Sequence, residues 1–123
     1  RPALGRLHWC VRLAVWLLYF NGDHAMSTQS SISSLPLFSL GQIVATPALL
    51  RHFDQHRIDA RHYLKRHVTG DFGNLDDEDK AENIFAIEHG FRILSAYMIA
   101  GRKVWCITEA DRSCTTLLFP EEY

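Results

Sequence analysis

Two polar stretches of this sequence contain residue types that can act on a phosphate ester. His67 precedes the glycine-containing sequence VTGDFG, and the stretch from Asp111 to Thr116 (DRSCTT) places charges, hydroxyls and a thiol between two apolar runs. A histidine can deprotonate a 2′-hydroxyl, and an arginine can stabilise the charge that develops on phosphorus. The candidate catalytic residues are therefore His67, Thr108, Arg112 and Ser113, with Tyr97 nearby on the predicted sheet.

Both stretches also have a structural interpretation. Asp111 and Arg112 are typical of a hairpin turn closed by an ion pair or a side-chain cap, and the following serine and threonines are ordinary strand residues. On this interpretation, Arg112→Ala costs about 0–1 kcal/mol, the usual range for an exposed ion pair. A histidine beside a turn, such as His67, is also commonly structural. The sequence leaves both interpretations open.

A metal site is not predicted. His52 and His56 lie four residues apart, but the sequence HFDQH has Phe53 where a metalloprotease helix carries its catalytic glutamate. The two histidines are therefore interpreted as part of a solvated helix face. We expect no cofactor either.

A basic segment makes nucleic acid a candidate partner. The side chains that could contact phosphates are Arg51, Arg57, Arg61, Lys65 and Arg66. The acidic segment Asp71–Glu88 would explain the same charges equally well as an intramolecular match. The formal net charge of −1 argues against a general polyanion binder.

Length and composition predict one modest domain, because the chain has 123 residues, 47% of them apolar. Cys10, Cys106 and Cys114 form no CxxC pair and leave one cysteine over in any disulfide scheme, which suits a reducing cytoplasm. Cys106 and Cys114 could face each other across the last hairpin, yet we expect them to be reduced.

The N-terminal segment differs from the rest of the chain. It begins with Arg1, and its apolar run Leu13–Phe20 is too short to span a bilayer, which takes about 20 residues. Asp23 does not suit a signal-peptide cleavage site after Ala25. We expect Met26 to be the true start, residues 1–36 to form a non-native-like or disordered extension, and residues 37–123 to form the domain. A chain starting at Met26 should then fold as stably as the whole.

Hydrophobic periodicity and capping residues predict three helices. Thr46 followed by proline begins a short helix that ends near His56. Asp59 caps a second helix, which the sequence TGDFGN ends. A third follows the acidic run Asp76–Asp79, with Ala81, Ile84, Phe85 and Glu88 at helical spacing, and ends at Gly90.

Strands precede and follow these helices. The sequence LFSLGQIVAT alternates as a strand, and RILSAYMI, KVWCIT and CTTLLF form a predicted three-stranded meander. The fold class that follows is α+β: a small antiparallel sheet, made from the N-terminal strand and the C-terminal meander, with about three helices on one face.

Four segments resemble the small "plasmid-related proteins" of plasmids, phages and integrative elements. They are LFSLGQIVATPALL, YLKRHVTGDFGNLDDEDKAEN, RILSAY and VWCITEADRSCTTLLFPEEY, and together they extend from about Leu37 to Tyr123. Phe72 stands where the family usually has tryptophan, and TPALL lacks a glycine often found after the proline. The resemblance implies no established activity.

Some family members are labelled as subunit M of type I restriction endonucleases. Methyltransferase activity is not supported here, because the chain has no Asn-Pro-Pro-aromatic motif and no glycine-rich loop after a strand. The label is therefore interpreted as a neighbourhood of, or a partnership with, a restriction-modification system. We therefore expect a non-enzymatic accessory or interaction protein of a mobile genetic element, associated with restriction-modification or host defence. The alternative is a metal-independent RNase of barnase-like or RelE-like layout.

Overall fold

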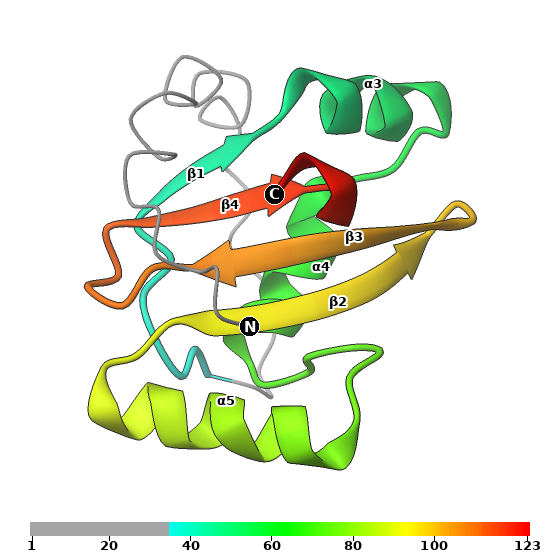
Figure 1. Cartoon of the computed structure of the whole chain (residues 1–123). Helices are drawn as coiled ribbons and strands as arrows, with labels where there is room; N and C mark the ends of the chain where they lie inside the picture. The colour runs from blue at the N-terminus through cyan, green and yellow to red at the C-terminus, as the bar shows by residue number, and fades with distance from the viewer. Residues whose placement is uncertain (1–34) are drawn as a thin grey trace.

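The computed structural model of the chain describes residues 35–123 (Figure 1). The predicted extension and the start at Met26 lie almost wholly outside the described residues, as does Cys10. These expectations stay predictions.

Four strands form one mixed sheet in the order β1-β4-β3-β2. The strands are β1 (Gln42–Ala45), β2 (Ile93–Ile99), β3 (Arg102–Thr108) and β4 (Cys114–Leu118). The predicted antiparallel meander of β2, β3 and β4 is confirmed. The expectation that the whole sheet is antiparallel is wrong, because β1 pairs with β4 in parallel. Both strands end beside the start of the helix that follows β1, where the Thr46 N–H donates to Leu117 O at 3.2 Å.

β1 is shorter than the alternating sequence predicts. Gly41 has a φ of +66°, and a Cβ at this position would lie 2.4 Å from the backbone oxygen of Arg112. The backbone of the β3–β4 turn therefore needs a glycine opposite it. The sharp bend at Gly41 prevents residues 37–41 from continuing the strand.

The three predicted helices are present, and each begins at the expected cap. They are α3 (Pro47–Gln55), α4 (Ala60–Val68) and α5 (Asp77–His89). Their N-cap side chains accept backbone N–H groups: Thr46 from Leu49, Asp59 from Arg61, and Asp76 from Asp79. α5 ends at Gly90 in the left-handed conformation, as predicted.

The main core lies between the sheet and helices α3 and α4 (Figure 1). The helices contribute Leu49, Leu50, Phe53, Ala60 and Leu64, and the sheet contributes Ala45, Tyr97, Ile99, Val104, Cys106 and Leu117. These strand residues share one face, because the register aligns Ala45, Leu117 and Cys106 across three strands. The expected α+β layout is confirmed, and α3 and α4 pack on one face of the sheet as predicted.

α5 packs at the β2 edge of the sheet and forms a smaller core with Phe72, Ala86 and Ile93. Its buried Asn83 joins the helix to the strand: the amide nitrogen donates to Leu94 O at 2.7 Å, and the amide oxygen accepts the Leu94 N–H at 3.1 Å. The backbone at Phe72 lies along the same edge of β2, because the Ala96 N–H donates to Phe72 O. Some of the backbone N–H and C=O groups at the free edge of β2 thus have hydrogen-bond partners.

The other face of the sheet carries a third apolar cluster, made of Leu94, Ile107 and Leu118 with Trp105 and Tyr123 packed against it. Among residues 35–123, the helices are all too short or too polar to cross a membrane.

Candidate functional site

His67 lies inside the protein, at the end of α4. Ala60, Leu64 and His67 are the buried residues of this helix, and their spacing places them on one face, toward the sheet. The imidazole is fully buried. Its Nδ1 lies 2.6 Å from Ser95 Oγ on β2, and its Nε2 lies 2.8 Å from Thr108 Oγ1 on β3.

These contacts continue as a chain of hydroxyl groups across the sheet. Thr108 Oγ1 lies 2.7 Å from Thr115 Oγ1, and the Thr115 hydroxyl donates to Leu40 O at 2.8 Å. A carbonyl can only accept and a hydroxyl has one proton, so Thr115 must accept from Thr108. Thr108 must then accept from His67.

The chain of hydrogen bonds therefore assigns the tautomer of His67. Nε2 carries the proton and donates to Thr108, and Nδ1 accepts the hydroxyl proton of Ser95. Burial is the main reason that the His67 pKa falls from 6.5 to about 3, and the nearby positive charge of Arg112 lowers it further. The imidazole is neutral at pH values near 7, and both of its nitrogens are occupied.

Arg112 lies in the β3–β4 turn and binds backbone carbonyls. Its Nη1 donates to the oxygens of Phe91 (2.7 Å), Glu109 (3.0 Å) and Ala110 (3.1 Å), and its Nη2 donates to Ala86 O (3.1 Å). These bonds join the turn to the C-terminal end of α5 and to Phe91, which follows the helix. The guanidinium thus links two elements of the fold.

The turn at Asp111 is closed by a side-chain cap, which was one of the two expected forms. Asp111 Oδ1 accepts the Ser113 N–H at 2.9 Å, an ordinary arrangement for aspartate in a turn. Hydrogen bonds from the Ser113 side chain and then from its backbone N–H lower the Asp111 pKa below its usual value. Ser113 itself is exposed.

The structure brings two of the four candidate catalytic residues into contact, His67 and Thr108. Phe38 lies near both His67 and Arg112: its ring is 5.1 Å from the His67 ring and 5.7 Å from the Arg112 guanidinium carbon. Tyr97 is buried and donates to Asp71 O at 2.6 Å. The four residues remain a hypothesis, but this arrangement presents neither nitrogen of His67 to a substrate.

The histidines of α3 have structural contacts. His52 is buried, and its Nε2 donates to Ile99 O at 2.9 Å, while His56 Nδ1 bonds His52 O at 3.0 Å. His52 was expected on a solvated face, and its burial corrects this. Residues 35–123 contain no cluster of three or more side chains suited to a metal ion.

Part of the predicted basic segment is neutralised by ion pairs. Arg61 pairs with Asp59 at 3.0 Å, and Arg66 pairs with Asp71 at 2.7 Å. The second pair joins the basic and acidic segments, as the intramolecular alternative expects. Arg51, Arg57 and Lys65 are exposed.

Cys106 does not face Cys114, and Cys114 is disulfide-bonded, so the expectation that both thiols are reduced is wrong for Cys114. Cys106 pairs with Leu117 across the hairpin, and Glu109 bonds the backbone of Cys114 three positions further along. The Cys106 thiol is free and fully buried in the main core, and burial raises its pKa.

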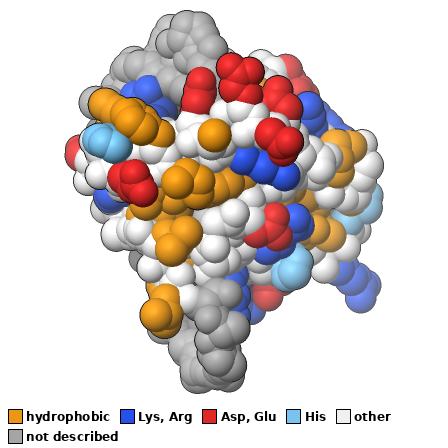
Figure 2. All heavy atoms as spheres, turned by 90° about the horizontal axis from the view of Figure 1, so that it is seen from below, with side chains coloured by type: hydrophobic (Ala, Val, Ile, Leu, Met, Phe, Trp, Pro, Cys, Tyr) orange, Lys and Arg blue, Asp and Glu red, His pale blue; other side chains and the backbone are white. Residues whose placement is uncertain are grey.

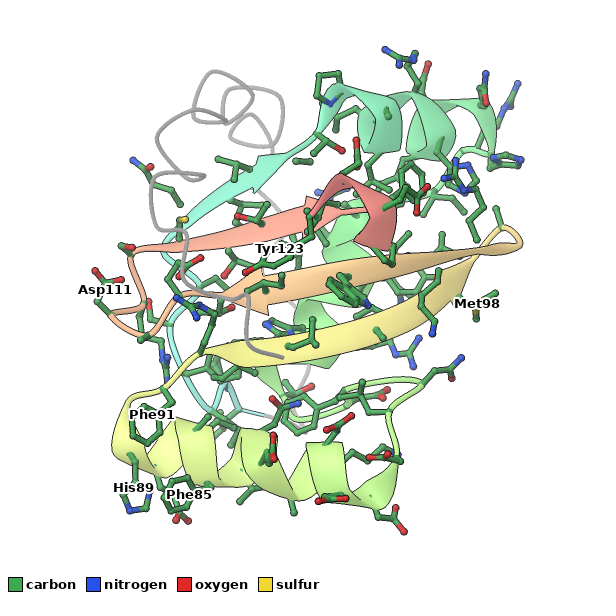
Figure 3. The ribbon with its side chains drawn as sticks, viewed as in Figure 1. Phe85, His89, Phe91, Met98, Asp111 and Tyr123 are labelled. Atoms are coloured by element: carbon green, nitrogen blue, oxygen red, sulfur yellow. The ribbon has the colours of Figure 1, made fainter. Side chains whose placement is uncertain are left out.

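An exposed apolar surface at the end of α5 was not assigned from the sequence. It consists of Ile84, Phe85, His89 and Phe91, here called the α5 surface. Phe85 stacks on His89 with ring centroids 4.0 Å apart, and on Phe91 at 5.9 Å. Figure 3 shows these three rings together at one end of the helix. In Figure 2, which views the molecule from the α5 side, hydrophobic side chains lie next to acidic ones.

A signal for this surface exists in the sequence. Four consecutive residues, Ile84–Ile87, are apolar, and four residues extend around most of a helix turn of 3.6 residues. Packing can bury only part of such a run. Ala86 is buried and Ile87 is half-buried, which leaves Ile84 and Phe85 on the solvent side.

Neither the family models, nor the curated proteins, nor the solved structures include a match to this chain.

Proposed function

We propose that this chain is a non-enzymatic interaction protein, an accessory protein of a mobile genetic element that acts in the cytoplasm with restriction-modification or host defence. The observation that carries the interaction role is the α5 surface, where Ile84, Phe85 and Phe91 are large apolar side chains about half exposed. The mobile-element setting rests on the sequence resemblance alone.

The environment of His67 supports a non-enzymatic role. A general base must reach the proton that it abstracts and must have a pKa near the working pH. His67 is fully buried, its two nitrogens already bond Ser95 and Thr108, and its pKa is lowered to about 3. These properties suit a structural polar core better than an RNase site.

The RNase remains the second candidate, and the His67–Thr108 contact at 2.8 Å is the observation that favours it. The exposed side chains of Arg51, Arg57 and Lys65 could also bind nucleic acid without cleaving it.

One experiment separates the two functions. The chain is expressed from an inducible promoter in a host that carries the element, and total RNA and tagged complexes are analysed from the same cells. We expect intact RNA, together with a protein that co-purifies at a constant stoichiometry in high salt.

The control variants are His67→Ala and Arg112→Ala, checked for folding by circular dichroism. Growth arrest with RNA fragmentation in the wild type, relieved in both folded variants, would establish the nuclease and overturn the proposal. Intact RNA with no specific protein partner would also reject it.

A further inference from the structure

We infer that the α5 surface docks into an apolar pocket bordered by lysine and arginine side chains on a different protein. The inference rests on the proposed interaction function and names its surface and the chemistry of its partner.

The apolar part of this surface is large and local. Six large hydrophobic side chains of residues 35–123 are exposed, and half of them lie here: Ile84 is 46%, Phe85 is 52% and Phe91 is 53% exposed. A helix C-cap of this type normally brings an apolar residue after the glycine into contact with the last turn, which explains why Phe91 meets Phe85. It does not explain why both rings stay half exposed.

The surface is held in shape before any partner binds. Gly90, with a φ of +75°, turns the chain back over the helix, and the Phe91 N–H donates to Ala86 O at 3.0 Å. Arg112 holds the same two residues through bonds to Phe91 O and Ala86 O. Because this backbone is already held in place, binding has to order less of the chain, which favours affinity.

The charge around these rings defines the partner. From Asp76 to His89 the chain has six acidic residues and one lysine, a net charge of −5 with histidine neutral. Glu82 and Glu88 lie three residues before and after Phe85, so they flank it on the helix. A pocket that accepts Phe85 would meet both carboxylates at its rim, where lysine or arginine gives electrostatic complementarity.

A second copy of this chain is a poor occupant. A two-fold contact through the α5 surface would bring two acidic helices together, and like charges across an interface are repulsive. The exposed basic residues Arg51, Arg57 and Lys65 lie on or next to α3 and α4, on different elements from the α5 surface. A head-to-tail contact between these parts would not close into a dimer.

The test begins with a photo-crosslinker, p-benzoylphenylalanine, placed at Ile84 of the full chain in host cells that carry the element. The same crosslinker at Met98 is the matched control, because Met98 is 52% exposed and lies at the far end of β2 (Figure 3). The protein captured at Ile84 is identified by mass spectrometry, purified, and titrated against the wild-type chain. Its crosslinked peptide is expected to contain lysine or arginine beside apolar residues.

Variants then test the surface with the purified partner. We expect Phe85→Ala and Phe91→Ala each to weaken the Kd by about tenfold or more, the behaviour of central aromatic anchors. Glu88→Gln should weaken it a few-fold and reduce its salt dependence. Met98→Ala and Asp54→Asn, both at exposed positions outside the surface, should leave the Kd unchanged.

Other outcomes would contradict the inference or the proposed function. Capture at Met98 but not at Ile84, capture of a second copy, a partner footprint without basic residues, or an unchanged Kd for folded Phe85→Ala and Phe91→Ala would overturn this inference and leave the interaction function standing. If no position on the chain captures a protein, the proposed function itself fails.

Discussion

At the scale of single residues, the neutral imidazole of His67 links the stability of the protein to pH. Burial lowers its pKa from 6.5 to about 3, so the unfolded chain binds a proton at pH values where the folded chain does not. The stabilisation is complete above the unfolded pKa and is lost as the pH falls. We expect the free energy of unfolding to decrease by up to roughly 1.4 kcal/mol per pH unit in this window.

Urea titrations at several pH values between about 7 and 4 measure this slope. His67→Gln removes the titrating group, so its unfolding free energy should be lower at neutral pH but should change less with pH. An equal pH dependence in the two proteins would show that other groups cause it. Nitrogen NMR of the wild-type imidazole provides a second check, and should find the proton on Nε2.

Arg112 is more important for stability than an exposed ion pair. Its four bonds to carbonyl oxygens include Phe91 O at 2.7 Å, and removal leaves these acceptors with fewer partners. We expect Arg112→Ala to lower the free energy of unfolding by about 1.5–3 kcal/mol, the range for hydrogen bonds with one charged partner. This replaces the smaller cost expected from an intraturn ion pair. Chemical denaturation measures it.

Arg61→Ala is the matched control, because Arg61 forms an ion pair with Asp59 on the surface. Its cost should be about 0–1 kcal/mol. If the Arg112 and Arg61 variants lose the same stability, the carbonyl bonds of Arg112 contribute little.

At the scale of elements, Asn83 joins α5 to the edge of the sheet. Its side chain is buried and makes both hydrogen bonds that the Leu94 backbone would otherwise make with another strand. Asn83→Ala should lower the free energy of unfolding by about 2–3 kcal/mol, because the Leu94 N–H and C=O lose their partners. The uncovered edge should also increase aggregation.

Asn74→Ala is the control, since Asn74 is an exposed residue in the loop before α5. Thermal melts and light scattering of the two variants at equal concentration give the comparison. Equal melting temperatures and equal scattering would contradict the role given to Asn83.

At the scale of the whole molecule, stability should be highest in the centre of the sheet. β3 and β4 each pair with strands on both sides, whereas α5 is anchored mainly by Asn83, Ala86 and half-buried Ile87. Amide hydrogen exchange should therefore be slowest in β3 and β4 and faster in α5. Mass spectrometry of exchanged peptides tests this order. Equal protection of α5 and β4 would show that the helix opens only with the whole protein.

The sequence alone determined the helices and the meander, because local chemistry decides them. Thr46 with proline, Asp59 and Asp76 are N-caps, Gly90 favours the left-handed conformation, and each satisfies backbone groups within one helical turn. The β2, β3 and β4 segments are likewise short apolar runs separated by turn residues, a pattern that their own sequences contain. These features need no knowledge of distant contacts.

The tertiary structure decided the direction of β1 and the roles of the polar residues. Parallel pairing of β1 with β4, and the break at Gly41, depend on a turn about 70 residues later in the chain. The chemistry of histidine made His67 a candidate catalytic residue in the sequence. Only the positions of Ser95 and Thr108 in the fold show that both ring nitrogens are hydrogen-bonded. The exposed face of α5 was decided in the same way, because an apolar run around a helix can be buried only where a neighbour covers it. Burial is a property of the assembled elements, so no local pattern could specify it.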